Sequence, residues 1–150
     1  MVRKRKKRVR DYHPSPWEEY FDTMRMVSAG DGTFRVFEKG PPPAPATDAA
    51  AAVPMVVLLH GCGLSALSFA LLAAELVQQV ECHVVAYDSR GHGATTTSAD
   101  ADLSLDTQCR DVVNVVTAVI GDAPPPPIVV MGHRYAFVLI YIFIYFEQLC

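Results

Sequence analysis

Three glycine-rich turns carry the residues of this chain that could do chemistry. They read HGCG at 60–63, RGHG at 90–93 and GH at 132–133, and each follows an apolar run. Glycine lets a backbone turn tightly and approach a ligand closely. A strand that runs into HGCG is typical of a loop whose backbone N–H groups stabilise an oxyanion. The pattern therefore predicts an oxyanion loop at Gly61, Cys62 and Gly63.

An alternating order of strands and helices would position these turns. Apolar runs at 54–60, 82–88 and 127–133 predict strands buried on both faces of a sheet. The segments 65–80 and 104–120 between them have the periodicity of amphipathic helices. Three such strands separated by two helices predict an α/β fold with a parallel sheet and right-handed crossovers. Sites in such sheets form at the carboxyl ends of the strands, where all three turns lie.

The helix signals also define which faces should be buried. The first helix is expected to bury Leu67, Ala70, Leu71, Ala74 and Val77. The second has Ser104 as its N-cap and Gly121 as its stop. Its buried side is expected to hold Leu105, Cys109, Val112, Val113, Val116 and Ile120.

The region before the first buried run is expected to be peripheral. Alternation at 33–40 predicts an edge strand. Trp17, Tyr20 and Phe21 belong to an extended arm, and these aromatic side chains are expected to pack onto the body.

Six longer stretches carry a resemblance to a known family. They are RDYHPSPWEEYFDTM at 10–24, DGTFRVFEKG at 31–40, VVLLHGCGLSALSF at 56–69, VECHVVAYDSRGHG at 80–93, DLSLDTQCRDVVNVV at 102–116 and GDAPPPPIVVMGH at 121–133. Together they resemble the protein phosphatase methylesterases of the α/β-hydrolase superfamily. The resemblance implies a partial α/β-hydrolase fold, namely the N-terminal half of the parallel sheet with its flanking helices. It also implies a serine carboxylesterase that removes the methyl ester from the C-terminal leucine of its partner, the protein phosphatase 2A catalytic subunit.

The chain departs from the family pattern at two places. Cys62 stands where the family has a glycine, and a positive φ there would be strained. After Gly132-His133 the family continues into Ser-Met-Gly-Gly, whereas this chain continues into Arg134 at the nucleophile position. Arginine stays protonated and cannot act as a nucleophile.

The other members of a catalytic triad are also missing from the sequence as given. In this superfamily an acid and a histidine follow the nucleophile in the chain, yet no Asp and no His follows Arg134. His60, His92 and His133 are expected to order their loops, and Asp88 is expected to be structural. We therefore expect no catalytic residue and no ester turnover. The alternatives that remain are a non-catalytic phosphatase-binding fragment and a small membrane-associated protein.

Three segments are predicted from the composition. Residues 1–26 form a basic, extended N-terminal arm, 27–133 form the partial hydrolase domain with a Pro/Ala-rich loop at 41–53, and 134–150 form a divergent hydrophobic tail. Its apolar run, YAFVLIYIFIYF, is shorter than the roughly 20 residues of a membrane span, so no membrane partner is expected.

Charge and cysteine content suggest an intracellular protein. Seven of the 13 Lys and Arg residues lie within the first ten positions, although the net charge is −3. The basic cluster could be a nuclear address or a solvated terminus, and the acidic body does not suit nucleic acid. The four cysteines match neither a zinc site nor a disulfide framework, so no metal and no cofactor is expected. Localisation is expected to be cytoplasmic, nuclear or both.

Overall fold

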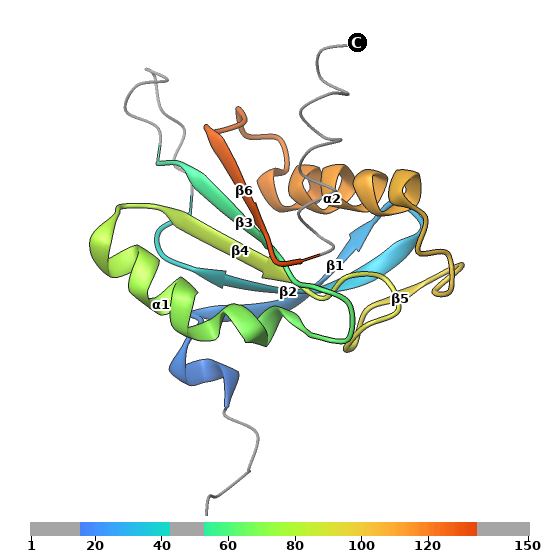
Figure 1. Ribbon diagram of the computed structural model, residues 1–150. Coiled ribbons are helices and arrows are strands. Elements are labelled where there is room, and N and C mark those ends of the chain that lie inside the picture. The colour runs from blue at the N-terminus through green and yellow to red at the C-terminus, as the bar shows by residue number, and fades with distance from the viewer. Residues whose placement is uncertain (1–15, 43–52, 135–150) are drawn as a thin grey trace, which may run out of the picture.

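The computed structural model describes residues 16–42 and 53–134, which form a six-stranded sheet with helices on both faces (Figure 1). The strands are β1 (Thr23–Ala29), β2 (Gly32–Lys39), β3 (Met55–Leu59), β4 (His83–Tyr87), β5 (Thr96–Thr97) and β6 (Ile128–Gly132). The helices are the short 3₁₀ turns η1 (Trp17–Glu19) and η3 (Ala66–Phe69), then α1 (Ala70–Gln79) and α2 (Leu105–Ile120).

The sheet order is β1-β2-β4-β3-β6, and β5 pairs with β2. Strands β4, β3 and β6 are parallel to one another, whereas β2 runs antiparallel to both β1 and β4. Every residue of β3 and β4 is buried, as expected of strands covered on both faces. The prediction of three parallel strands joined by two helices is confirmed.

Two apolar clusters fill the space between the sheet and its helices. One lies between α2 and the sheet and includes Phe34, Leu59 and Val115. The other lies between α1 and the opposite face and includes Leu58 and Ala73 (Figure 1). The aromatic residues before β1 join the second cluster, with Trp17, Tyr20 and Phe21 packed against Phe37 and its neighbours. The predicted packing of this aromatic group is confirmed.

The prediction that 33–40 forms an edge strand is wrong. β2 lies inside the sheet, because β1 pairs with it along seven residues from Thr23↔Glu38 to Ala29↔Gly32. The predicted boundary after residue 26 falls within β1, and Phe21 is already buried. The sheet therefore begins in the segment that we assigned to the arm. Residues 1–15, most of the Pro/Ala-rich loop and the tail from 135 onward lie outside the described residues.

The two predicted helices occur where we expected them, but some residues that we expected on their buried faces are exposed. Leu71, expected in the core, is 75% exposed, because the chain makes a 3₁₀ turn before α1 and this turn rotates the face that follows. In α2, Val113 is exposed, and Thr107, Asp111 and Val115 are buried in its place. Gly121 ends the helix at φ 65°, as predicted. Within the described residues, no helix is long and apolar enough to cross a bilayer.

Candidate active site

The three glycine-rich turns meet at the carboxyl ends of β3, β4 and β6, as predicted. Gly61 lies directly against the turn after β6: a Cβ at Gly61 would lie 3.0 Å from the carbonyl oxygen of His133 and 3.6 Å from the Cβ of Arg134. The His133 N–H donates to the carbonyl oxygen of Leu59 at 3.0 Å, which ties this turn to the end of β3. A side chain at position 61 would therefore crowd the turn after β6 and require a small shift of its backbone.

The loop at Gly61, Cys62 and Gly63 has the backbone of a tight turn. The N–H of Leu64 donates to the carbonyl oxygen of Gly61 at 3.1 Å. Gly63 has φ 74°, which suits glycine, whereas Cys62 does not have a positive φ. The strain that a positive φ would cause at Cys62 therefore does not arise, and Cys62 keeps a backbone N–H with its side chain exposed.

Two histidines hold the loops together. His60 is buried, its Nδ1 lies 2.9 Å from the carbonyl oxygen of Gly61, and its Nε2 accepts from the N–H of Ser89 at 2.9 Å. His92 repeats the arrangement, with Nδ1 at 2.9 Å from the carbonyl oxygen of Arg90 and Nε2 accepting from the N–H of Gly63 at 3.1 Å. In both rings Nδ1 must therefore carry the proton.

These contacts leave neither ring free to act as a general base. The two rings meet edge to face at 5.0 Å between centroids. Burial lowers the pKa of His60, which keeps it neutral at physiological pH. Both side chains thus have the loop-ordering contacts that the sequence suggested. One of the loop's own N–H groups, on Gly63, is already used by His92.

Arg134 sits on the turn that would carry a nucleophile. Its φ of 57° is positive, and it is the sole non-glycine residue in the described ranges with that property. In α/β-hydrolases the nucleophile lies on a sharp, strained turn between a strand and a helix. The backbone after β6 has such a conformation, although an exposed arginine side chain stands on it.

Asp88 and Arg90 are structural parts of the loop after β4. The Asp88 carboxylate is fully buried and accepts from the N–H of Ala66 at 2.8 Å and from Nε of Arg35 at 2.6 Å. Its Oδ2 also lies where a Cβ on Gly93 would be, which explains a glycine with φ 57° at that position. Arg90 binds Asp111 of α2 and Asp31 of the β1–β2 turn.

A cavity of about 250 Å³ opens beside the loop. His60, Cys62 and His92 line it. Leu103, from the segment before α2, and Gln108, from the first turn of α2, complete the lining. Sequence reasoning missed Leu103 and Gln108, because no motif marks a residue that reaches a site from a neighbouring helix. Within the described residues no group of three metal-ligating side chains occurs.

Comparisons with known proteins agree with this geometry. A model of the "Alpha/beta hydrolase family" matches residues 56–133. Protein phosphatase methylesterase 1 of Bos taurus is 43% identical over 130 residues, and that of Homo sapiens is 42% identical over 130 residues. The probable protein phosphatase methylesterase 1 of Caenorhabditis elegans is 34% identical over 124 residues.

These alignments cover most of this chain and less than half of its relatives. The Bos taurus protein aligns with 84% of this chain, which spans 31% of that protein's length. Among solved structures, an epoxide hydrolase of Vigna radiata superimposes with a TM-score of 0.68 at 19% identity, covering 87% of this chain and 37% of the other. At that identity the match shows the fold alone. The chain belongs to the alpha/beta hydrolase family, and its relatives within that family are protein phosphatase methylesterases.

Proposed function

We propose that the loop at Gly61–Gly63 and the turn at Arg134 form a carboxylesterase site of the protein phosphatase methylesterase type in which the nucleophile has been lost. The observation that carries this proposal is the close approach of the two segments: a Cβ added to Gly61 would lie only 3.0 Å from the carbonyl oxygen of His133. Such packing places backbone N–H donors beside a strained turn, which is the arrangement an acyl-transfer site requires.

The substrate that fits this proposal is the methyl ester on the C-terminal leucine of the protein phosphatase 2A catalytic subunit. The names of the relatives support a methyl ester on a phosphatase. The cavity beside the loop also supports it, since Leu103 and Cys62 supply apolar lining next to the two histidines.

This chain by itself is expected to leave that ester intact. A guanidinium stays protonated and cannot attack a carbonyl carbon. Both His60 and His92 have their ring nitrogens engaged by backbone groups, so neither can take a proton from a nucleophile. An enzyme of this class that lacks its nucleophile loses several orders of magnitude in rate.

Binding without hydrolysis is the second candidate function, and Arg134 favours it. A guanidinium pairs with a carboxylate through two parallel N–H···O bonds, whereas a methyl ester offers no negative charge. An arginine on this turn would therefore retain the free carboxylate of a demethylated tail in preference to the methylated one.

One experiment tests both candidates. The purified full chain is mixed with two synthetic phosphatase tail peptides, one ending in leucine methyl ester and one in free leucine. Mass spectrometry follows hydrolysis and fluorescence anisotropy follows binding. We expect no hydrolysis, with tighter binding of the free acid. Saturable turnover that a serine-directed fluorophosphonate blocks would overturn the first statement, and equal affinity for the two peptides would overturn the second.

A further inference from the structure

The loop at Gly61–Gly63 is held by a hydrogen bond that only a neutral histidine can make. The N–H of Gly63 donates to Nε2 of His92 at 3.1 Å, and Nδ1 of the same ring lies 2.9 Å from the carbonyl oxygen of Arg90. A backbone N–H can only donate and a carbonyl oxygen can only accept, so the two ring nitrogens have fixed roles. Nε2 is the acceptor and Nδ1 carries the single proton. The backbone partners of His92 therefore define its protonation state.

A second proton on His92 would break the bond to Gly63. An imidazolium has an N–H on both nitrogens, so Nε2 and the Gly63 N–H would meet as two donors. The contact at Nδ1 would survive, because the carbonyl oxygen of Arg90 still accepts. Gly63 is exposed, and a Cβ added to it would meet no atom within 4 Å, so this part of the loop has room to move. Protonation thus keeps the ring in place and releases the Gly63 N–H.

Acid reaches His92 before His60. The two rings meet edge to face, with 5.0 Å between their centroids. Burial lowers the pKa of His60, and a positive charge on His92 lowers it further. The ring of His92 is half-buried and lines the 250 Å³ cavity beside the loop, where water can hydrate an imidazolium. At neutral pH the bond to Gly63 keeps Nε2 engaged, and a fall in pH drives proton uptake there.

The groups around the cavity leave a protonated His92 in need of an anion. The titratable and charged side chains near the loop are His60, Cys62, Asp88, His133 and Arg134, from the ends of β3, β4 and β6. The Asp88 carboxylate is buried and already accepts from Arg35. Arg134 is a permanent cation, and the wall on the α2 side is uncharged. A bound anion would therefore be stabilised by both positive charges.

We propose that His92 is an acid-sensitive latch: the neutral ring holds the Gly63 N–H, and the protonated ring releases it, so that both groups donate to a bound carboxylate. This inference rests on the proposed function, in which Arg134 retains the free carboxylate of a peptide tail. A carboxylate has about four acceptor positions, so pairing with Arg134 leaves positions for these two donors. Acid tightens the binding of a free carboxylate. A methyl ester gains little, because it has no charge to pair with an imidazolium.

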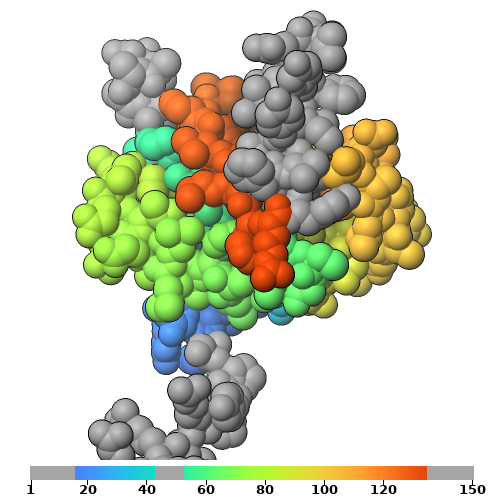
Figure 2. All heavy atoms as spheres, viewed as in Figure 1, coloured from blue at the N-terminus to red at the C-terminus, as the bar shows by residue number. Residues whose placement is uncertain are grey.

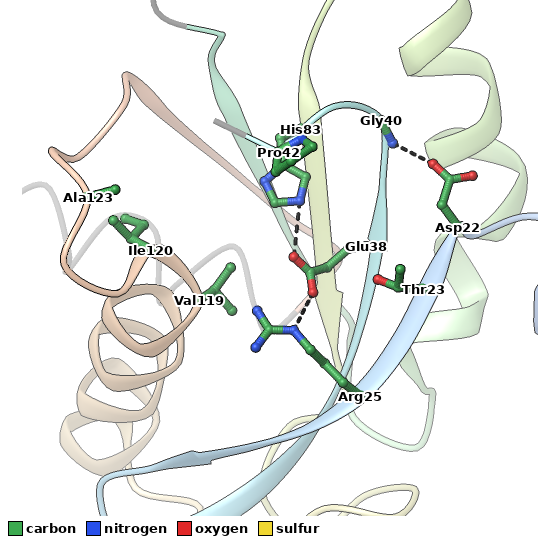
Figure 3. Close-up of a pocket in the computed structure, with 10 residues that line it drawn as sticks. All are labelled: Asp22, Thr23, Arg25, Glu38, Gly40, Pro42, His83, Val119, Ile120 and Ala123. Atoms are coloured by element: carbon green, nitrogen blue, oxygen red, sulfur yellow. Dashed lines mark hydrogen bonds and ion pairs between the residues drawn. The ribbon is translucent and has the colours of Figure 1, made fainter. Parts of the chain in front are cut away.

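A histidine at the other end of β4 has the opposite kind of partner. His83 lies beside a cavity of about 390 Å³ that Arg25 and Glu38 also line (Figure 3). Nε2 of His83 is 3.1 Å from Oε2 of Glu38, and a carboxylate oxygen accepts a hydrogen bond. An added proton leaves this contact in place, whereas it breaks the contact between His92 and Gly63. His83 therefore serves as an internal reference for effects of acid on the fold.

The first experiment follows the latch in the ¹⁵N-labelled full chain between about pH 7.5 and about pH 5. Long-range ¹H–¹⁵N spectra report the tautomer and charge of each ring, and amide spectra report on Gly63. We expect the Nδ1–H tautomer of His92 at the higher pH and a Gly63 amide shift with the same midpoint as the His92 ring. An Nε2–H tautomer, a His92 ring that stays neutral throughout, or a Gly63 amide that does not follow it refutes the latch.

The second experiment measures binding of the two tail peptides by fluorescence anisotropy at about pH 7.5 and about pH 5.5. The tail carboxylate stays ionised at both values, since its ordinary pKa is about 3.5. We expect the affinity for the free acid to rise about tenfold at the lower pH and that for the methyl ester to stay unchanged. A preference for the free acid that is equal at both pH values overturns the latch and leaves the proposed function intact. Equal binding of the two peptides at the higher pH overturns the proposed function, and the Gly63 titration then still decides the latch.

Two substitutions of His92 fix the latch in its two states. In His92→Gln the amide oxygen takes the place of Nε2 and accepts from Gly63 at every pH, so binding of the free acid should stay weak and independent of pH. In His92→Asn the shorter side chain reaches only the position of Nδ1, so the Gly63 N–H is free and binding should be tighter than in His92→Gln at about pH 7.5. His133→Gln is the matched control, and it should keep the tenfold rise. A rise that disappears in His133→Gln and persists in His92→Gln refutes the proposal. If a variant folds poorly, the Gly63 titration in the unmodified chain decides.

Discussion

Arg90 and Asp111 form a two-point ion pair inside the protein, with Nε donating to Oδ2 and Nη2 to Oδ1, both at 2.9 Å. Arg90 is 2% exposed and also donates to Asp31, to the hydroxyl of Thr97 and to the carbonyl oxygen of Ala99. One side chain therefore links helix α2, the β1–β2 turn and the loop after β4, and this loop carries His92 of the candidate site.

Removing one partner of this pair should destabilise the fold. Asp111→Ala leaves the buried guanidinium of Arg90 with fewer acceptors. We expect the free energy of unfolding to fall by about 3 kcal/mol, which is the low end for a broken buried pair, because Asp31 still accepts from Arg90. Urea unfolding followed by circular dichroism measures the loss. Glu75→Ala on the exposed side of α1 is the control, and its effect should stay within about 0.5 kcal/mol. Equal effects of the two variants would contradict a structural role for the pair.

The same network should make stability depend on pH in the acid range. Hydrogen bonds from Arg90 and from Ser98 lower the pKa of Asp31 to about 2. The folded protein thus binds a proton at Asp31 more weakly than the unfolded chain does, so acid favours unfolding. The contribution is complete above the ordinary pKa of 3.8 and is lost as the pH falls toward 2. The stability curves of the unmodified chain and of Asp31→Asn should therefore converge below pH 4, and parallel curves would contradict this.

Restoring a serine at the nucleophile position should not restore an esterase. Arg134→Ser supplies a hydroxyl on a turn of positive φ, yet both loop histidines are already engaged by backbone groups. Without a base the hydroxyl remains a weak nucleophile. We expect p-nitrophenyl acetate turnover by Arg134→Ser to equal that of Arg134→Ala. A serine variant at least a hundredfold faster than the alanine variant would show that a base is within reach.

The parallel part of the fold could be read from the sequence because β3 and β4 are buried on both faces, and such strands consist of continuous apolar residues. β1 was missed because only Val27 and Ala29 of its seven residues are buried, which leaves too little pattern to recognise. The glycine-rich turns predicted the candidate site. The contact between His83 and Glu38 could not be predicted, because it depends on the pairing of β2 with β4, and register is not visible in either strand alone.

The basic cluster at 3–10 should act as a nuclear address. It stands on a chain whose net charge is −3, and clusters of this kind are recognised by import receptors. The first 15 residues fused to a fluorescent protein should concentrate the reporter in the nucleus. The matched control replaces the lysines and arginines of the cluster by glutamine. A reporter that spreads evenly with the native cluster would contradict the prediction.

Strand β6 should drive self-association of the 150-residue chain. It pairs with β3 on one side, and no strand among residues 16–42 and 53–134 pairs with its other edge, where N–H and C=O groups would be open to another chain. Ile128, Val129 and Met131 are 40%, 49% and 37% exposed, and the end of the described chain lies at the surface (Figure 2). An apolar strand with an open edge pairs readily with other chains.

A single charge on this edge tests the idea. Val129→Lys places a cation on the strand and should raise the monomer fraction in size-exclusion chromatography with light scattering. Leu71→Lys is the matched control, because Leu71 is more exposed than Val129 yet lies on helix α1, away from the open edge. If the control improves the monomer fraction as much as Val129→Lys does, general surface hydrophobicity is the cause. If neither chain associates at all, the open edge of β6 is covered in solution and the prediction is wrong.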